Sequence, residues 1–287
     1  MTPIQLGSIQ VSRVVEYEGP TSLRFLFPGL APQRLTPHLD WLCPLFFSRE
    51  TSTMILSVHS FVLRIRHHTI LVDTCLGNDK PRSYDPWNMR QGSYLADLQA
   101  AGVAPEQVDF VMCTHLHTDH VGWNTRLADG RWMPTFPRAK YIFARREWEH
   151  WHHADDPEEQ QVIQDSVLPV IEANQALLVD ADFALNDEVW LEPTHGHTPG
   201  HVSIHLASGG KEGVITGDMI HHPLQMALPD VTSFACENPE QAVATRRAFL
   251  SRYAGQDTLI LGTHFAAPTA GHVIEAGEAW RFQPWLG

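Results

Sequence analysis

The six residues His115-Leu116-His117-Thr118-Asp119-His120 contain four side chains that can bind a metal ion. They follow the apolar run Val108-Asp109-Phe110-Val111-Met112-Cys113, which is typical of a buried β-strand. A loop at the end of a strand can direct several ligands to one point, and imidazole nitrogens with carboxylate oxygens suit zinc, iron and related ions. A histidine-rich surface loop is the alternative interpretation, but HxHxDH directly after a strand favours a metal site.

Three further segments end a predicted strand, or lie beside one, with residues that can bind a metal. They are Thr194-His195-Gly196-His197-Thr198-Pro199-Gly200-His201, Ile215-Thr216-Gly217-Asp218 and Leu261-Gly262-Thr263-His264. Either of the last two alone would more often be a plain surface residue. Together with HxHxDH they indicate one composite site, because four such segments are hard to attribute to chance.

The order of these motifs resembles the metallo-β-lactamase superfamily, over roughly Leu71 to His264. The resemblance implies an α/β (α+β) fold, a four-layer αββα sandwich, with a dinuclear metal site at one edge of its two sheets. We expect residues 1–287 to form a single domain. Two segments, at about 19–47 and 78–91, are expected to be loops.

The resemblance also implies a role for each ligand. His115, His117 and His197 would hold the first metal, Asp119, His120 and His264 the second, and Asp218 would bridge the two. Two divalent ions are therefore expected; zinc is preferred, and Mn, Fe or Co fit the same donors.

Other residues are expected to support these ligands. Asp73 lies where the family keeps a carboxylate that accepts a hydrogen bond from a metal-binding imidazole, although Asp-Thr-Cys-Leu-Gly departs slightly from the family turn. His195 is expected to support the ligands, and His201 to hydrogen-bond the backbone in a turn. His221 would support the oxygen of the substrate or act as a general acid, with simple packing left open. Asp119 could return a proton to the leaving group.

The ligand set also indicates which branch of the superfamily the chain resembles. Asp218 stands where common class B β-lactamases use cysteine, and His117 where redox di-iron relatives have Glu. The chain looks most like acyl-homoserine lactonases and methyl-parathion-hydrolase-type enzymes. We expect a dinuclear hydrolase that uses a metal-bridging hydroxide on a lactone, ester or phosphotriester.

Aromatic residues are concentrated in the two expected loops and beside the motif. They would form the wall of the substrate pocket; the alternative is that they cover a sheet edge or a dimer contact. The residues concerned are Phe25, Phe27, Trp41, Phe46, Phe47, Trp87 and Trp123.

The composition of the chain limits the classes of partner that we expect it to bind. The formal net charge of −13 argues against nucleic acid as the main partner, because phosphate binding requires a basic surface. No leader sequence and no stretch as long as a membrane span is visible, and the four cysteines form no CxxC pair. We expect a cytoplasmic protein with free thiols and a small-molecule substrate, with no nucleic-acid or membrane partner, and a homodimer is possible.

Two other functions stay open. One is a mononuclear iron oxygenase resembling persulfide dioxygenases, which share HxHxDH. The other is a non-catalytic binding protein on the same fold.

The periodicity predicts helices over 93–101, 147–153, 158–173 and 239–253, and strands over 9–16, 54–58, 61–65, 69–72, 108–113, 140–143, 188–193, 201–207, 213–216 and 258–261.

Overall fold

The structure is a computed structural model that describes residues 3–286, and its residues group into two compact units. We call residues 3–16 and 58–181 the motif unit, because they contain HxHxDH, and residues 17–57 and 182–286 the C-terminal unit. The strands β2 and β4 each run from one unit into the other. The expectation of a single domain stays a prediction, and residues 1, 2 and 287 lie outside the described part.

The motif unit is built on a mixed sheet with the strand order β1-β2-β4-β5-β6-β9-β10. Its last four strands are parallel, so their carboxyl ends meet at one edge. Its strands are β1 (Ile4–Leu6), β2 (Ile9–Thr21), β4 (Thr53–Ile65), β5 (His68–Val72), β6 (Phe110–Met112), β9 (Lys140–Ala144) and β10 (Ala176–Val179), with a separate hairpin of β7 (Thr125–Ala128) and β8 (Arg131–Pro134).

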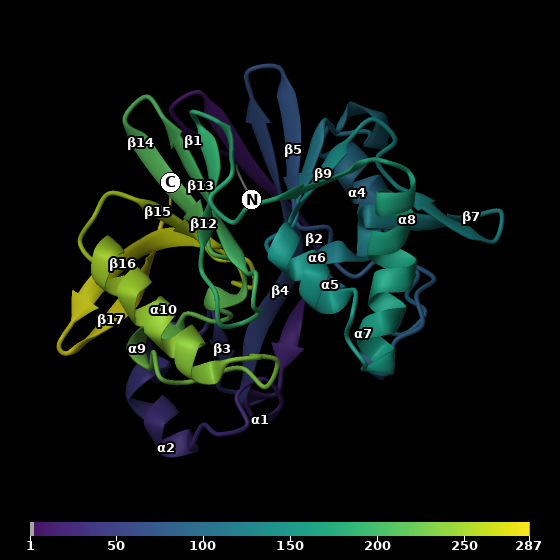
Figure 1. Cartoon of the computed structure of the whole chain (residues 1–287). Helices are drawn as coiled ribbons and strands as arrows, with labels where there is room; N and C mark the ends of the chain where they lie inside the picture. The colour runs from purple at the N-terminus through teal and green to yellow at the C-terminus, as the bar shows by residue number, and fades with distance from the viewer. Residues whose placement is uncertain (1–2, 287) are drawn as a thin grey trace. The chain divides into compact units, whose positions relative to one another are not determined.

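Helices of the motif unit connect and cover these strands. The helix α6 packs against β9 and β10, and the β7–β8 hairpin extends away from that sheet (Figure 1). The helices are α4 (Tyr94–Ala100), α5 (Thr118–Val121), α6 (Arg145–Trp151), α7 (Pro157–Val162) and α8 (Leu168–Glu172), with 3-10 turns η2 (Asp85–Trp87), η3 (Pro105–Gln107) and η4 (Gly122–Asn124). Between α7 and α8 lies η5 (Ile163–Val167), a π-helical segment.

The C-terminal unit is built on a second sheet with the order β11-β12-β13-β14-β15-β16-β17. Its one parallel pair among the described strands is β14 with β15, which brings the ends of these two strands together. The strands are β11 (Ala184–Asn186), β12 (Val189–Pro193), β13 (Val202–Ser208), β14 (Lys211–Ile215), β15 (Leu259–Leu261), β16 (Ala270–Ala276) and β17 (Ala279–Pro284), and β3 (Phe47–Ser48) pairs with β4.

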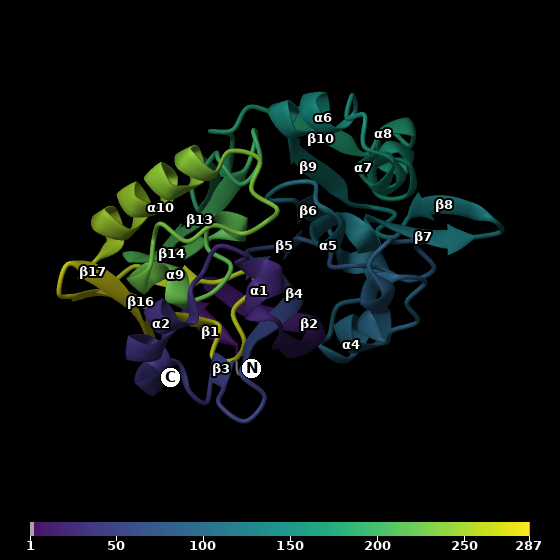
Figure 2. The same cartoon turned by 90° about the horizontal axis from the view of Figure 1, so that it is seen from below.

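One long helix covers this second sheet. The helix α10 (Pro239–Tyr253) lies against it and contacts β16 (Figure 2). As predicted, Asn238 caps the helix by accepting a hydrogen bond from Gln241 N–H, and Pro239 is its first residue. The shorter helices are α1 (Leu23–Leu26), α2 (Pro32–Leu35), η1 (Thr36–His38), α3 (Leu39–Leu42), η6 (Gly217–Met219) and α9 (Leu224–Ala227).

The prediction that 19–47 is a loop is therefore wrong in part, because short helices occupy much of it. Their apolar side chains enter a hydrophobic cluster with residues of the second sheet. Phe46 lies within it, with its ring centroid 5.8 Å from that of Phe282 and 6.3 Å from that of Phe265. Burial of these rings explains why a segment rich in proline and aromatic residues is ordered.

Two expectations about environment can be compared with the structure. Over residues 3–286, no helix combines the length and the apolar character that crossing a bilayer requires. The four cysteines are free, as expected, and Cys75 and Cys113 are buried.

Candidate metal centre

The parallel strands of the motif unit place three functional segments at one sheet edge. Asp73 follows β5, the HxHxDH loop follows β6, and Glu147 follows β9 in the first turns of α6. Because carboxyl ends of parallel strands meet at the same edge, residues far apart in sequence come into contact there. Hydrogen bonds that Asp73 and Glu147 accept hold the HxHxDH loop at this edge.

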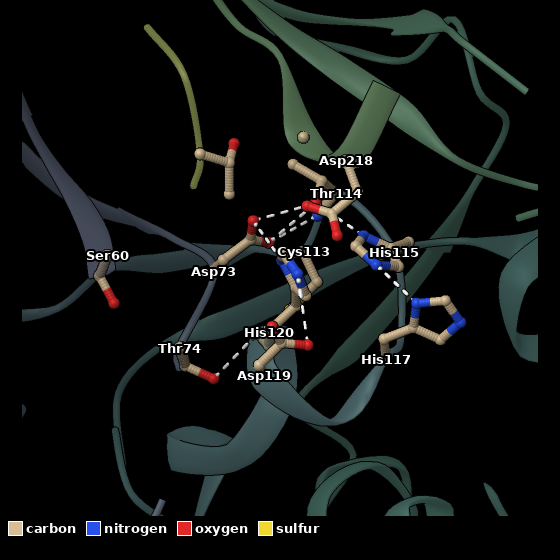
Figure 3. Close-up of polar contacts among 12 residues, drawn as sticks. Ser60, Asp73, Thr74, Cys113, Thr114, His115, His117, Asp119, His120 and Asp218 are labelled. Atoms are coloured by element: carbon tan, nitrogen blue, oxygen red, sulfur yellow. Dashed lines mark hydrogen bonds and ion pairs between the residues drawn. The ribbon is translucent and has the colours of Figure 1, made fainter. Parts of the chain in front are cut away.

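Asp73 is the anchor of the HxHxDH loop (Figure 3). One carboxylate oxygen accepts a hydrogen bond from Thr114 N–H at 2.8 Å, and the other accepts from Nδ1 of His120 at 2.9 Å. The Asp73 backbone has φ +56°, in the left-handed region that non-glycine residues rarely occupy, as is often found at functional sites. The predicted supporting position of Asp73 matches this geometry.

The imidazoles of the loop turn lone pairs toward other ligand atoms. The Thr114 hydroxyl donates to Asp73, so it accepts from Nδ1–H of His115, and Nε2 of the neutral His115 ring carries a lone pair. That Nε2 lies 3.1 Å from Nδ1 of His117 (Figure 3). Likewise, Nε2 of His120 lies 3.6 Å from a carboxylate oxygen of Asp119. A tetrahedral ion with bonds of about 2.0–2.1 Å keeps its ligand atoms roughly 3.3 Å apart, so this spacing suits one.

Glu147 is a supporting residue that the sequence analysis missed. Its side chain is buried, and one carboxylate oxygen accepts from Leu116 N–H at 3.2 Å and from the indole N–H of Trp151 at 2.8 Å. It therefore fixes the backbone between His115 and His117. The signal was available, since Glu147 shortly follows a buried strand, as Asp73 does.

The C-terminal unit gathers three imidazoles around one carboxylate. The carboxylate of Asp218, in η6 after β14, lies 3.0 Å from Nε2 of His264, 3.2 Å from Nε2 of His221 and 3.5 Å from Nε2 of His197. All four side chains are buried. His197, Asp218 and His221 offer ligand atoms within 4.8 Å of one another. The structure therefore brings together His197, Asp218 and His264, which the sequence analysis assigned to the metals, and His221, which it assigned to the substrate; these roles stay predictions.

The other ring nitrogens of two of these imidazoles are already engaged. Nδ1–H of His264 donates to the carbonyl of Ser57 at 2.9 Å, which leaves a lone pair on Nε2 of the neutral ring. Nδ1 of His197 lies 3.5 Å from Sγ of Cys236. Burial raises the pKa of the Cys236 thiol to about 11, so a neutral thiol faces His197. No feature of the sequence pointed to Cys236.

His201 and His195 have different surroundings. Nε2 of the buried His201 accepts from Asp218 N–H at 2.8 Å, and its Nδ1 lies 3.1 Å from the carbonyl of Thr194. This bonding to backbone was predicted, and it also fixes the bridging candidate Asp218. Nδ1 of His195 lies 3.2 Å from the carbonyl of His201, so His195 supports the same turn.

His221 and His222 are adjacent but have different roles. Burial lowers the pKa of His221, against the raising effect of Asp218, and its Nδ1 has no hydrogen-bond partner among the described residues. Nε2–H of His222 instead donates to the carbonyl of Phe46 at 2.9 Å, and its Nδ1 accepts from Leu224 N–H at 3.2 Å. His222 is thus a satisfied core histidine, whereas His221 directs Nε2 toward Asp218 and has no hydrogen-bond partner for Nδ1 among the described residues.

We predict that His222 makes the protein less stable in acid. Burial lowers its pKa to about 4, whereas the ring titrates near 6.5 when unfolded, so only the unfolded state binds this proton between those values. The free energy of unfolding should fall by up to ~3 kcal/mol from this residue as the pH drops through that window. Urea unfolding at several pH values should show a shallower fall for His222→Gln; equal slopes in both proteins would refute the assignment.

The aromatic residues expected at the substrate wall are divided between core and surface. Phe27 and Phe46 have no exposed surface, and Trp123 donates its indole N–H to Glu16 and stacks on Tyr94. These three rings fit the alternative that aromatic residues cover the sheet.

The remaining aromatic candidates keep contact with solvent or with a cavity. Phe25 is 39% exposed, and Trp41 and Trp87 are half-buried. Phe47 lines a cavity of about 490 Å³ in the C-terminal unit, together with Leu23, Leu39 and Arg24. A role of these residues in substrate binding stays a prediction.

Comparison with known proteins gives a family match. The model of the metallo-β-lactamase superfamily matches residues 54–264. An N-acyl homoserine lactonase of Bacillus thuringiensis is 25% identical over 188 residues, which is 65% of this chain and 64% of that enzyme. The chain spans less than two thirds of the length of the curated lactonases that it matches.

Solved structures match over nearly the whole chain. The hydrolase AbOPH of the β-lactamase superfamily superposes with a TM-score of 0.82 at 25% identity, covering 99% of this chain and 97% of that one. The dizinc quorum-quenching lactonase AidC gives a TM-score of 0.79 at 19% identity, covering 100% and 97%. These matches confirm the predicted mixed α/β fold class.

Proposed function

Because the chain belongs to the metallo-β-lactamase superfamily, we propose that it is a metal-dependent hydrolase that holds two divalent ions and cleaves a lactone, ester or phosphotriester. The observation that carries this proposal is the set of lone pairs around Asp218. Nε2 of His264 faces the carboxylate at 3.0 Å although the hydrogen of that ring is already donated to Ser57. Lone pairs this close repel one another unless a proton or a metal ion lies between them, and three imidazole nitrogens around one carboxylate suit a metal ion.

The ligands that we propose are those of the sequence motifs. His115, His117 and His197 would hold one ion, Asp119, His120 and His264 the other, and Asp218 would bridge. The donors are nitrogen and oxygen without thiolate, which suits zinc and also Mn, Fe or Co. The arrangement inside each unit supports this set, because each group already orients lone pairs toward a shared point.

In the proposed hydrolysis, the metal ions and the side chains of the protein would have different roles. Two divalent ions at such a centre supply an activated water as nucleophile and polarise the oxygen under attack. Nδ1 of His221 is buried and has no hydrogen-bond partner within residues 3–286, so this imidazole would donate to or accept from an oxygen of the substrate. Asp119, which is only partly buried, would return the proton to the leaving group.

A lactone or related ester is the substrate class that the comparisons favour. The B. thuringiensis relative is an N-acyl homoserine lactonase, and AidC is a dizinc lactonase. AbOPH, with the highest TM-score quoted above, is described only as a hydrolase, so aryl esters and phosphotriesters belong in the same test. A cytoplasmic location and a homodimer stay predictions of the sequence.

A substrate panel tests the proposal. Protein stripped by a chelator and reloaded with Zn²⁺, Mn²⁺ or Co²⁺ is assayed with acyl-homoserine lactones, aryl esters and an aryl phosphotriester. We expect metal-dependent turnover of at least one class, and the same rate for His153→Gln, a variant of an exposed histidine. Loaded protein that cleaves none of the three classes would exclude the proposal and favour a non-catalytic binding protein.

A further inference from the structure

The motif unit contains a buried ionic cluster that the sequence analysis did not identify. Arg82 Nη1 and Nη2 donate to the two carboxylate oxygens of Asp165 at 2.7 and 2.9 Å, and Lys80 Nζ lies 3.3 Å from the same carboxylate. The side chains of Lys80 and Asp165 are 1% exposed and that of Arg82 is 2% exposed. Lys80 also lies over the ring of Trp132 at 3.9 Å.

Asp165 reaches this position from an unusual backbone. It lies in the π-helical segment η5, which interrupts the helix between α7 and α8. Single turns of π-helix are rare and frequently occur at functional sites, because the extra residue redirects a side chain. Here Ser166 Oγ and Gln161 Nε2 also donate to the carboxylate, so it is fully engaged.

The cluster connects to the HxHxDH loop through one hydrogen bond. Arg82 Nε donates to Oγ1 of Thr118 at 2.7 Å, and Thr118 is the residue between His117 and Asp119. Thr118 is also the first residue of α5, in which His120 N–H donates to the carbonyl of His117 at 3.0 Å. Within residues 3–286, Arg82 is the one side chain that forms a hydrogen bond with the hydroxyl of Thr118.

Stability alone is a weak reason to bury such charges. Removing two cations and one anion from water is costly, and apolar residues of similar volume often fill such a space with no loss of stability. A guanidinium adds something that apolar residues cannot supply, because its planar fork binds the carboxylate with two N–H groups while a third N–H points elsewhere at a fixed angle. In this cluster the third N–H is the one that binds Thr118.

We propose that Arg82 is a positioning residue for the metal loop, with Asp165 fixing its guanidinium and Thr118 receiving its hydrogen bond. This inference rests on the proposed metal site, because the hydrogen bond from Arg82 to Thr118 would fix the positions of the neighbouring ligands His117 and Asp119. It also gives Arg82, in the 78–91 segment, a role inside the motif unit.

Substitutions at Thr118 test the proposal with the least disturbance. Thr118→Val keeps the shape of the side chain and removes the acceptor, whereas Thr118→Ser keeps the hydroxyl and is the matched control. Loss of a partner that supports metal ligands typically weakens metal affinity by about 10–100-fold. We expect that change in the Zn²⁺ dissociation constant for Thr118→Val and for Arg82→Lys, measured by chelator competition, and wild-type affinity for Thr118→Ser.

Two further readouts separate positioning from general stability. In metal-free protein, amide exchange at His120 should accelerate in Thr118→Val but not in Thr118→Ser. The double variant Arg82→Lys/Thr118→Val should bind Zn²⁺ no more weakly than the weaker single variant, because both remove the same hydrogen bond. If Arg82→Lys fails to fold, the comparison of Thr118→Val with Thr118→Ser still tests the positioning role.

The outcomes distinguish this inference from the proposed function. If wild-type protein binds Zn²⁺ and Thr118→Val matches it in affinity and in exchange at His120, the positioning role is wrong while the metal site stands. If wild-type protein binds no metal, the proposed function fails, and exchange at His120 alone decides whether Arg82 orders the loop.

Discussion

Replacing Asp218 with alanine should lower metal-dependent hydrolysis more than about 100-fold, beyond the usual cost of losing a residue that only supports a ligand. The carboxylate is buried and has three imidazole nitrogens within 3.5 Å, so its removal leaves these nitrogens without the anion that they surround. Steady-state rates with the panel substrate that is turned over fastest, together with the metal content of the variant, measure the effect.

The control for this variant is Asp257→Asn. Asp257 is an exposed carboxylate that pairs with Lys211 at the surface. Its replacement should leave both the metal content and the rate unchanged. If Asp218→Ala kept its full rate, Asp218 would not be a ligand that the reaction requires.

Replacing Phe46 with alanine should lower the free energy of unfolding by about 3–5 kcal/mol. The ring has no exposed surface, and it packs edge-on against Phe265 and Phe282. Removal of so large a buried ring leaves a cavity that the neighbours fill only partly. Urea denaturation of the metal-free protein measures the loss without any contribution from bound ions.

The same variant decides between the two interpretations of the aromatic segment. A core role predicts a large loss of stability for Phe46→Ala and a smaller one for Phe46→Leu. Phe25→Ala, at a ring that is 39% exposed, should cost clearly less. A raised KM with unchanged stability in Phe46→Ala would instead place this ring at the substrate wall.

The sequence singled out the candidate ligands because each follows a short apolar strand, and their role as metal ligands stays a prediction. Parallel pairing then brings strand ends together, which makes residues such as Asp73 and His115, or Asp218 and His264, neighbours within their units. Period-2 and period-3.6 patterns sufficed to predict β5, β9 and α10. The family resemblance supplied the roles of the ligands, which spacing alone does not give.

The residues that support the ligands were harder to predict, for a physical reason. Glu147, Cys236 and Arg82 act through hydrogen bonds across the fold, to Leu116, His197 and Thr118 respectively. Such contacts leave no periodic trace in the sequence, although Glu147 could have been identified from its position shortly after a buried strand. The π-helical turn at Ile163–Val167 is equally invisible, because a continuous helix over 158–173 has nearly the same pattern.

Most of the other differences between the predicted and the observed structure concern aromatic residues and the C-terminal end of the chain. Large apolar side chains in a segment rich in proline look alike whether they line a pocket or fill a core, so Phe27 and Phe46 were expected at a wall. The hairpin of β16 and β17 was not predicted at all. The alternation of apolar and polar residues around Gly277 was the signal that could have identified it.

Metal content of protein purified without added metal, measured together with hydrolysis and oxygen consumption, tests the central claim most directly. The account predicts two divalent ions per chain, hydrolysis that follows their occupancy, and no oxygen uptake. One iron per chain with oxygen consumption would contradict it and would favour the mononuclear oxygenase.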